Sequence, residues 1–241
     1  MKRINNHLPS LEHPNYHAGE RALLNSVDCV ILGFQGIELH VLLIRFPYEP
    51  FKGHWSLIGG FVTPDVDIDE AARITVKKMT GLSDVFMQQV YTFGDINRVP
   101  SERVITSCYF ALIRIEPTLV TLTSTYEATW FPISQIPPLV YDHARMLDAA
   151  LFNLRRKIRF QPVGFELLPE KFTMSELRNL YQSILGRELE KRNFTRKVLK
   201  MNILQKLREK DKLSSKKGSY LFRLNKKRYQ FLLDKGFLFD M

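Results

Sequence analysis

The sequence predicts an α+β protein with two domains: an N-terminal α/β/α sandwich over residues 1–158 and a C-terminal winged helix-turn-helix domain over residues 159–241. Three observations predict this division. Strand-like apolar segments with one clear helix among them fill the first domain. Two capped amphipathic helices, a basic loop and a strand fill the second. The net charge also changes sign near residue 152.

The positive charge of the chain is concentrated in its last third. The 241 residues carry a net charge of +10. Residues 1–152 hold 12 Lys and Arg and 16 Asp and Glu, a net −4, whereas residues 153–241 hold 23 and 9, a net +14. Such an excess predicts a polyanionic partner for the second domain, and DNA, RNA and an anionic membrane surface are the candidates.

The composition excludes several classes of protein. A hydrophobic fraction of 45% is that of a folded soluble protein. No apolar run reaches the roughly 18 residues of a membrane span, and the N-terminal segment lacks the apolar core of a signal peptide. We therefore expect a cytoplasmic protein. Cys29 and Cys108 lie in strand-like segments without metal-ligand spacing, so we expect buried free thiols.

The first domain alternates strand and helix patterns. Residues 26–46, rich in Val, Ile and Leu, predict two strands around a turn at Gln35 and Gly36. A third extended segment, at residues 54–62, contains a pair of glycines. Further strands are expected at 85–96, 103–115 and 127–133, and helices at 67–80 and 142–160. Residues 161–171, with two prolines and a glycine, predict a linker.

The second domain begins with a helix whose two ends are marked in the sequence. Thr173 and Glu176 predict a capping box, and Phe172 and Leu177 predict a hydrophobic staple beside it. Gly186 is typical of a residue that ends a helix. These signals place the first helix of the domain at about residues 174–185.

A second, basic helix follows after a short turn. It begins at about residue 187 or 188 and turns four apolar side chains inward: Leu189, Phe194, Val198 and Met201. A basic loop tip at residues 214–218 then leads into a strand, and Asn225 caps a last helix. This order of elements predicts a helix-turn-helix with a wing.

One stretch, GGFVTPDVDIDEAARITVKKMTGL at residues 59–82, has the frame of a phosphate-handling motif. It resembles the Nudix box, which reads Gly, five residues, Glu, seven residues, Arg-Glu-apolar-x-Glu-Glu-x-Gly-apolar. Anchored on Gly60, the frame matches at Val76, Gly81 and Leu82. The five positions that carry the chemistry hold Val66, Ile74, Thr75, Lys78 and Met79. Because magnesium needs several carboxylates on one helix face, we expect no metal, no cofactor and no catalysis.

The acids near the box leave one alternative open, and they are Asp65, Asp67, Asp69 and Glu70. A displaced metal site is one interpretation of this cluster. The interpretation that we favour is structural, with Asp67 and Glu70 forming an N-cap and capping box. Acidic side chains are also stabilising at the positive end of a helix.

The resemblance extends beyond the box. Residues 54–62 resemble the strand and glycines that precede a Nudix box, residues 128–147 resemble the segment that closes a Nudix domain, and residues 172–199 resemble a helix-turn-helix. In this order they are similar to the Nudix-related transcriptional regulators over nearly the whole chain. The resemblance implies a Nudix-like sensor without hydrolase activity and a winged helix that binds a palindromic double-stranded DNA operator as a homodimer.

The resemblance also implies a class of effector. Some members of that family respond to ADP-ribose or related nucleotides, and a Bacteroides branch with degraded boxes responds to L-arabinose. The degraded box and the Phe- and Pro-rich segment RFPYEPFKGHWSLIGG make this sequence most similar to that branch. L-arabinose is therefore the expected effector, ahead of ADP-ribose. The expected effector-binding residues are Lys52, His54, Trp55, Arg98, Glu102 and Tyr126.

The basic second helix carries most of the expected DNA contacts. Base edges in the major groove are assigned to Arg192, Asn193, Arg196 and Lys197. Phosphate contacts are expected from Lys and Arg side chains and from the helix N-terminus near Ser175, and Lys191 and Lys200 are also expected to contact DNA. In the wing, Lys216 and Lys217 are expected to contact phosphate or the minor groove.

Two rival functions remain at this stage. One is a magnesium-dependent Nudix pyrophosphohydrolase that acts on ADP-ribose or a related nucleotide and carries a nucleic-acid-binding tail. The other is a general polyanion or membrane-surface binder, which would show no preference among DNA sequences. The hydrolase predicts turnover that a chelator abolishes, and the polyanion binder predicts no preference among DNA sequences. These two properties distinguish both rivals from a transcriptional regulator.

Overall fold

The computed structural model describes residues 22–117, 127–212 and 218–235 of the chain. A mixed sheet forms the centre of the first domain, with strand order β3-β2-β1-β6-β5. Additional pairings join β4 to β1 and β7 to β2. The strands are β1 (Leu24–Gln35), β2 (Glu38–Arg45), β3 (Trp55–Ser56), β4 (Ile58–Phe61), β5 (Phe86–Phe93), β6 (Val104–Leu112) and β7 (Thr129–Pro132). The expected strands are therefore all present.

Strand β1 is the central element of this sheet. It runs parallel to β6 along one edge, with Leu24 opposite Val104 and Leu32 opposite Leu112. Along its other edge it is antiparallel to β4 near its start and to β2 near its end. Both faces of β1 are covered, which explains why its sequence is a continuous apolar run instead of an alternating one.

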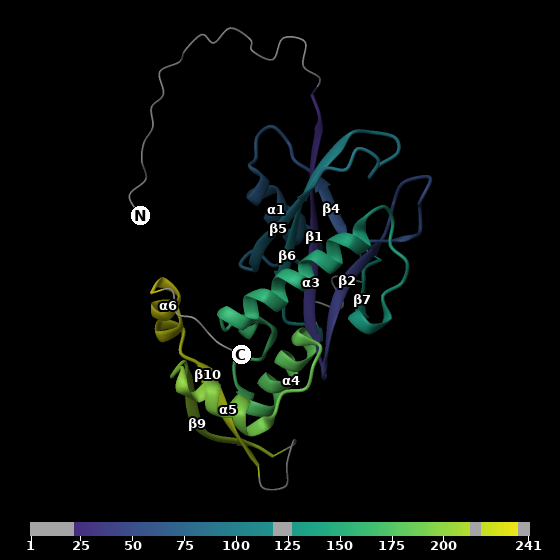
Figure 1. The fold of residues 1–241 in the computed structure, drawn as a ribbon. Coiled ribbons are helices and arrows are strands. Elements are labelled where there is room, and N and C mark those ends of the chain that lie inside the picture. Colours follow the sequence, from purple (N-terminus) through teal and green to yellow (C-terminus); the bar gives the residue numbers. More distant parts are fainter. Residues whose placement is uncertain (1–21, 118–126, 213–217, 236–241) are drawn as a thin grey trace, which may run out of the picture.

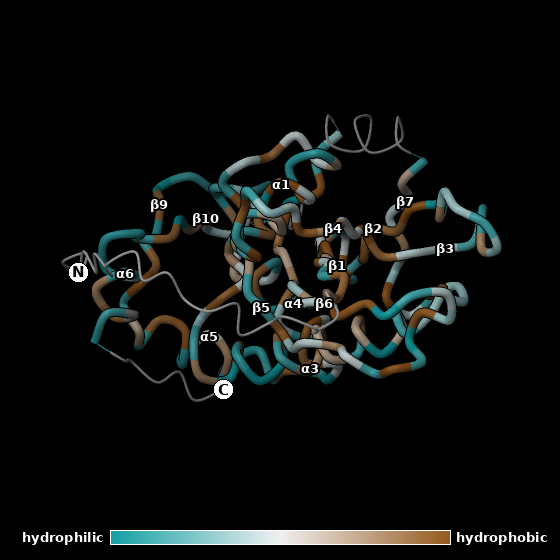
Figure 2. Tube along the Cα trace, turned by 90° about the horizontal axis from the view of Figure 1, so that it is seen from above, coloured by the Kyte–Doolittle hydropathy of each residue, from teal (hydrophilic) through white to brown (hydrophobic). Residues whose placement is uncertain are grey.

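Two helices cover the two faces of the sheet, α1 (Ile68–Thr80) and α3 (His143–Phe160). Figure 2 shows them on opposite sides of the strands. On the α1 side, Cys29 and Ile31 pack with the helix residues, whereas Val30 and Leu32 point into a second cluster with α3. The α/β/α sandwich predicted from the sequence is confirmed. Among the described residues, no helix has the length and apolar character needed to cross a membrane.

The ends of α1 follow from its sequence. The Asp67 side chain accepts a hydrogen bond from the Glu70 backbone N–H at 2.7 Å, as the N-cap prediction requires. Gly81 ends the helix with φ of 72°, in the left-handed region that glycine adopts without strain. Both cysteines are buried free thiols, as predicted, and burial raises the pKa of each.

The second domain is a winged helix (Figure 1). Its elements are β8 (Phe172–Thr173), α4 (Met174–Leu185), α5 (Lys191–Lys200), β9 (Leu204–Asp211), β10 (Ser219–Leu224) and α6 (Lys226–Asp234). The capping box of α4 forms in full, because the Thr173 backbone N–H donates to the Glu176 carboxylate and the Glu176 N–H donates to the Thr173 hydroxyl.

Two details of this domain differ from the sequence prediction. Helix α5 begins at Lys191, later than expected, because the Glu190 carboxylate accepts from the N–H groups of Arg192 and Asn193 and so caps the helix there. Residues 204–211 form the strand β9, which the sequence did not predict. Its charged side chains are mostly exposed, so it lacks the apolar alternation that marks a strand.

The predicted linker at residues 161–171 is not an exposed tether. Val163, Phe165 and Leu167 are buried in a core that is continuous from the sheet to the winged helix. Polar contacts join the domains as well: the Leu39 N–H donates to the Ser183 hydroxyl at 2.7 Å, and Arg155 Nε donates to the Ile184 carbonyl at 2.9 Å. The winged helix is therefore packed directly on α3 and the β1–β2 hairpin.

The two glycines of β4 differ in how much space surrounds them. A Cβ on Gly59 would lie 2.4 Å from Asp28 Oδ1 and 3.0 Å from the Val27 carbonyl oxygen, whereas a Cβ on Gly60 would lie 3.1 Å from Thr75 Oγ1. We expect Gly59→Ala to lower the free energy of unfolding by about 1–3 kcal/mol and Gly60→Ala to lower it less. Urea unfolding measures the stability of both variants, and equal losses would contradict the tighter packing around Gly59.

Candidate functional site

The segment that resembles the Nudix box forms a loop followed by α1. Gly60 lies against the helix next to Thr75, whose hydroxyl donates to the Ala71 carbonyl at 2.8 Å. Met79 is buried in the core beneath α1, and Lys78 is exposed to solvent. Three positions that hold glutamates in the Nudix pattern therefore carry other groups. Thr75 has a hydroxyl bonded within its own helix, Met79 has a buried thioether, and Lys78 has an ammonium exposed to solvent.

The four nearby acids all have structural partners: Asp65, Asp67, Asp69 and Glu70. In the same order, these partners are the Thr63 hydroxyl, the Glu70 backbone N–H, the Tyr109 hydroxyl and the Arg73 guanidinium. Each carboxylate is thus used by the start of α1 or by its packing on the sheet. The predicted N-cap is confirmed, but the predicted capping box is not complete, because the Glu70 carboxylate pairs with Arg73 and not with the Asp67 backbone N–H. Within the described residues, no group of three or more His, Cys, Asp or Glu is placed to hold a metal ion.

The expected effector-binding residues fall into two places. Lys52, His54 and Trp55 come together on the segment between β2 and the glycine pair, where Lys52 and His54 are exposed. The Arg45 guanidinium lies 3.8 Å from the centre of the Trp55 ring. Glu102 is exposed in the turn before β6. Tyr126 lies outside the described residues.

Arg98 is buried and fully engaged with protein carboxylates. Its Nε and Nη2 donate to the two oxygens of Asp142 at 3.1 and 2.9 Å, and Nη2 lies 3.7 Å from Asp28 Oδ2. The Thr106 hydroxyl donates to the same Asp28 oxygen at 2.8 Å. Two carboxylates therefore compensate one guanidinium inside the protein, which joins the segment before β6 to the start of α3.

His143 belongs to the same buried network. The Leu57 backbone N–H donates to His143 Nδ1 at 3.1 Å, which leaves the ring proton on Nε2, 3.8 Å from Asp28 Oδ1. Burial lowers the pKa of His143, and this effect outweighs the opposing influence of Asp28 and Asp142. The histidine is accordingly neutral in the folded protein at pH 7.

The lowered pKa of His143 makes stability depend on pH. In the unfolded chain the imidazole titrates near its ordinary pKa of about 6.5, so below that pH only the unfolded state gains the proton. The stabilisation is therefore complete above about pH 7 and is lost as the pH falls towards the folded pKa. Urea titrations at pH 7.5 and 5.5 will show a larger loss for the wild type than for His143→Gln. Equal losses would contradict this assignment.

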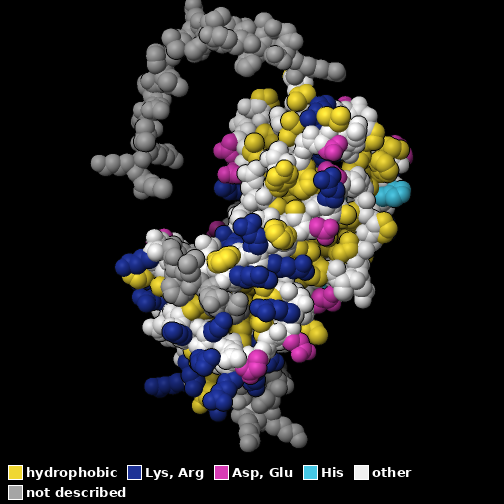
Figure 3. All heavy atoms as spheres, viewed as in Figure 1, with side chains coloured by type: hydrophobic (Ala, Val, Ile, Leu, Met, Phe, Trp, Pro, Cys, Tyr) yellow, Lys and Arg dark blue, Asp and Glu magenta, His cyan; other side chains and the backbone are white. Residues whose placement is uncertain are grey.

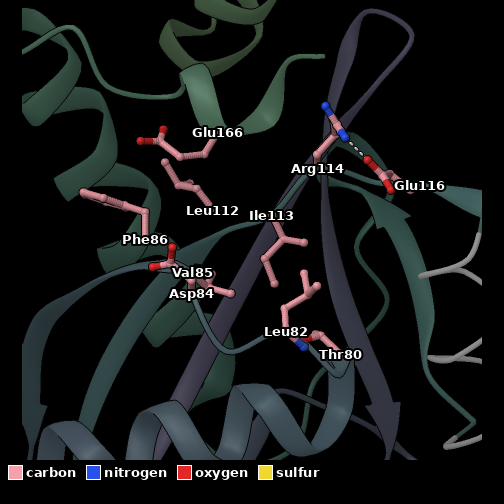
Figure 4. A pocket seen from close by; sticks show the side chains of 10 residues that line it. All are labelled: Thr80, Leu82, Asp84, Val85, Phe86, Leu112, Ile113, Arg114, Glu116 and Glu166. Carbon is pink, nitrogen blue, oxygen red and sulfur yellow. Dashed lines mark hydrogen bonds and ion pairs between the residues drawn. The ribbon is translucent and has the colours of Figure 1, made fainter. Parts of the chain in front are cut away.

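Two cavities lie away from the expected effector residues. The larger, about 300 Å³, is at the junction of β5, β6 and the 3-10 helix η2 (Phe165–Leu167). Figure 4 shows Phe86, Leu112 and the Glu166 carboxylate around one space, with the Arg114–Glu116 ion pair to one side. The second cavity, about 250 Å³, is lined by Asp69, Arg73, Met87, Gln89 and Tyr109. None of the five expected effector residues that the structure describes lines either cavity.

Helix α5 presents the expected basic face. Phe194 and Val198 are buried against the rest of the domain. The exposed side chains of the helix include all of the assigned contacts: Lys191, Arg192, Asn193, Arg196, Lys197 and Lys200. Ser175 is exposed in the first turn of α4. Lys216 and Lys217 lie outside the described residues. Figure 3 shows Lys and Arg side chains gathered over the part of the molecule that contains these helices.

Two features orient this basic face. The Glu190 carboxylate caps α5, and the two backbone N–H groups that it accepts from lower its pKa, so it is ionised at neutral pH. Arg196 Nη2 donates to Asn193 Oδ1 at 2.9 Å, which links two of the assigned base-reading side chains. The wing strands add further cations, since the ammonium groups of Lys206 and Lys210 lie 3.6 and 4.7 Å from the centre of the Tyr220 ring.

Comparisons with known proteins agree with this architecture. The NUDIX domain model matches residues 22–150, and the model of the NrtR DNA-binding winged helix domain matches residues 164–224. The "ADPR responsive transcriptional repressor NtrR" of Acinetobacter baylyi is 30% identical over 212 residues, which cover 86% of this chain and 84% of that protein. The crystal structure of Shewanella oneidensis NrtR superposes with a TM-score of 0.75 at 26% identity, covering 83% of this chain and 94% of that chain.

This chain belongs to the NrtR family. A Nudix domain and an NrtR-type winged helix are both present, in the order that the sequence predicted. A second relative, the "ADP-ribose pyrophosphatase" of Methanocaldococcus jannaschii, is 32% identical over 107 residues, which cover 44% of this chain and 63% of that protein. Its similarity is therefore partial. Helix α3 begins within the Nudix match and ends before the winged helix match, so in this NrtR-type protein it connects the two.

Sequence reasoning missed two parts of this NrtR-type protein. The buried network of Asp28, Asp142 and His143 joins residues far apart in the chain, and only Arg98 was singled out from it. The strand β9, which carries the cations Lys206 and Lys210, was not predicted either. The sequence does contain a signal for this strand, because Lys206, Arg208 and Lys210 alternate at the strand period.

Proposed function

We propose that this chain is a transcriptional repressor that binds operator DNA through its winged helix and responds to ADP-ribose or a related nucleotide bound by its Nudix domain. The observation that carries the proposal is the exposed basic face of α5, in a winged helix domain that packs directly on the Nudix domain of the same chain. The relative from Acinetobacter baylyi, which aligns over most of both chains, is named as an ADPR-responsive repressor.

The proposed reading of DNA follows from the chemistry of α5. Arginine, lysine and asparagine side chains recognise guanine and adenine edges in the major groove, and a helix fits that groove. Arg192, Asn193 and Arg196 stand on the exposed side of a helix whose other side is buried. Lys191 and Lys200 add positive charge for phosphate contacts. A basic helix without base contacts would instead bind all sequences equally.

The proposed ligand differs from the one expected from the sequence. Both relatives described above are named for ADP-ribose, and neither is named for a sugar. The expectation of L-arabinose rested on a degraded box and a Phe- and Pro-rich segment, and the comparisons give it no support. We keep L-arabinose as the competing ligand in the test.

The proposed sensor binds its ligand without hydrolysing it. Val66, Thr75, Lys78 and Met79 offer no set of carboxylates for magnesium, and the Thr75 hydroxyl is already bonded to Ala71. The residues at these positions do not fit the metal that Nudix hydrolysis uses. The competing function is a magnesium-dependent pyrophosphohydrolase, which the M. jannaschii relative is named for.

A homodimer is part of the proposal. Winged helix and helix-turn-helix proteins read palindromic operators as dimers, with half-sites about one helical turn apart. The ligand would then act by shifting the population of arrangements in which both α5 helices fit their half-sites. Light scattering of the purified protein tests the dimer, and a monomer in the presence of operator would overturn it.

Gel shifts with the DNA upstream of the gene, with ADP-ribose or L-arabinose added, test the whole proposal. We expect a sequence-specific shift whose midpoint changes with ADP-ribose and not with L-arabinose. A response to L-arabinose alone would restore the sugar as effector. Incubation with ADP-ribose and magnesium tests the rival, because turnover that a chelator abolishes would establish a hydrolase.

A further inference from the structure

The start of α3 contacts an aromatic cluster that lies far away in the sequence. We define this aromatic cluster as Phe46, Tyr48, Phe51 and His54, and Tyr141, just before α3, packs against it. The Tyr141 ring lies 5.6 Å from the Phe46 ring and 5.1 Å from the Phe51 ring, in both cases edge to face. Tyr48 and His54 pack against Phe46 and Phe51 and are exposed to solvent. The cluster therefore joins the segment that carries Lys52, His54 and Trp55 to the start of α3.

Tyr141 has an unusual backbone. Its φ of 49° lies in the left-handed region, which bulky residues other than glycine rarely adopt. Such a conformation persists only where the surrounding packing holds it, and it is concentrated in switch regions and ligand-binding sites. Here the rings of Phe46, Phe51 and His143 pack against the Tyr141 ring. If these rings moved, residue 141 would have a second, more favourable backbone well available to it.

The next two residues are fixed to other parts of the sensor domain. Asp142 accepts two hydrogen bonds from Arg98, and His143 accepts one from the Leu57 N–H. Tyr141, Asp142 and His143 thus face three different segments: the aromatic cluster, the stretch before β6 and the strand pair β3 and β4. A change of backbone at Tyr141 acts directly on the first turn of α3.

Helix α3 connects Tyr141 to the winged helix. Its 18 residues span about 27 Å at the helical rise of about 1.5 Å. Near its C-terminal end, Arg155 Nε donates to the Ile184 carbonyl of α4, and the chain that follows is buried. A continuous packed path therefore runs from the aromatic cluster to the helix-turn-helix.

We propose that Tyr141 is the positioning residue that couples ligand binding in the sensor domain to DNA binding by the winged helix. This inference rests on the proposed function, because it requires a ligand that alters DNA affinity. The bistable element is the Tyr141 backbone, held in its left-handed well by Phe46 and Phe51. A ligand that contacts the β2–β3 segment displaces these rings and so shifts the equilibrium at Tyr141.

The test compares Tyr141→Gly with Tyr141→Phe in the full chain. Glycine adopts the left-handed region freely and has no ring, whereas phenylalanine keeps the ring and the backbone constraint. For each protein, the operator Kd is measured with and without a saturating concentration of ADP-ribose, and again with L-arabinose, and ADP-ribose binding is measured by calorimetry. The coupling factor is the ratio of the operator Kd values with and without ligand, and allosteric proteins typically show about 5- to 150-fold.

We expect Tyr141→Gly to bind operator alone, and ligand alone, as the wild type does, while its coupling factor falls below about twofold. Tyr141→Phe is expected to keep the wild-type factor. Full coupling in the glycine variant would overturn the inference, and so would loss of ligand binding, because Tyr141 would then be a contact residue. If the glycine variant does not fold, Tyr141→Asn, which tolerates the left-handed region, is judged by the same outcomes.

Failure of the proposed function gives a different result. A wild-type protein whose operator Kd changes with neither ligand overturns the proposed function, and the inference with it, whereas a coupled wild type with a coupled glycine variant overturns the inference alone. Linkage supplies an independent readout, because operator must change ligand affinity by the same factor that ligand changes operator affinity. A purely structural role for Tyr141 would change stability without changing this reciprocal factor.

Discussion

Replacing Arg196 and Lys197 together by alanine will abolish sequence-specific binding to the operator and leave the fold intact. Both side chains are exposed on α5, away from the buried Phe194 and Val198. Each base-edge contact is worth about 1–3 kcal/mol, so removal of both weakens operator binding by at least about 30-fold. Fluorescence anisotropy on operator and on scrambled DNA measures the change in affinity, and circular dichroism checks the fold.

The matched control for this variant is Lys77→Ala with Lys78→Ala. These two exposed cations lie near the end of α1, so their removal changes the net charge equally but leaves the winged helix untouched. Operator affinity should stay within about twofold of the wild type, since charges at distances beyond a Debye length are largely screened. Equal losses of affinity in both variants would show that total charge drives binding and would favour the general polyanion binder.

The salt dependence of binding separates the two kinds of DNA contact proposed for α5. Each Lys or Arg that neutralises a phosphate adds about 0.9 to the slope of log K against log salt. Lys200→Ala, at a position assigned to phosphate, should therefore make the slope shallower and leave the preference for operator over scrambled DNA intact. A reduced preference at an unchanged slope would move Lys200 to the base-reading group.

The two helices α4 and α5 could be predicted from sequence because their signals are local. Thr173 and Glu176 stand three residues apart, Gly186 marks the end of α4, and Phe194 and Val198 recur at the helical period. The signals for helix α1 are equally local, because Asp67 caps its start and Gly81 ends it. Capping and periodicity act within one or two turns, so a single sequence carries them.

The centre of the sensor domain could not be predicted in this way. Arg98 was singled out as a ligand contact, but it meets Asp142 across 44 residues and Asp28 across the sheet. Only the fold brings these charges together, and a lone arginine in a turn gives no sign that it will be buried. The strand β9 was missed for a different reason, since its pairing with β10 and not an apolar pattern determines its conformation.

Asp142→Ala is expected to destabilise the protein strongly, because it leaves the buried Arg98 guanidinium without its bidentate partner. The Arg98 side chain is 3% exposed, and its remaining carboxylate, on Asp28, lies 3.7 Å away. Breaking a buried ion pair from one side typically costs about 3–5 kcal/mol. Urea unfolding at pH 7.5 measures the change, and an unchanged m-value will show that the same surface is exposed on unfolding.

Two comparisons make this prediction specific to burial. Glu70→Ala breaks the exposed ion pair with Arg73, at 3.4 Å, and should cost less than about 1 kcal/mol. The triple change Asp28→Asn, Arg98→Met and Asp142→Leu removes all three buried charges together and should recover much of the stability, because uncharged residues of similar volume often replace a buried ionic triad at little cost. If Asp142→Ala costs no more than Glu70→Ala, the Arg98 charge must be solvated or compensated by Asp28 alone. The start of α3 would then be held mainly by His143 and the Tyr141 ring.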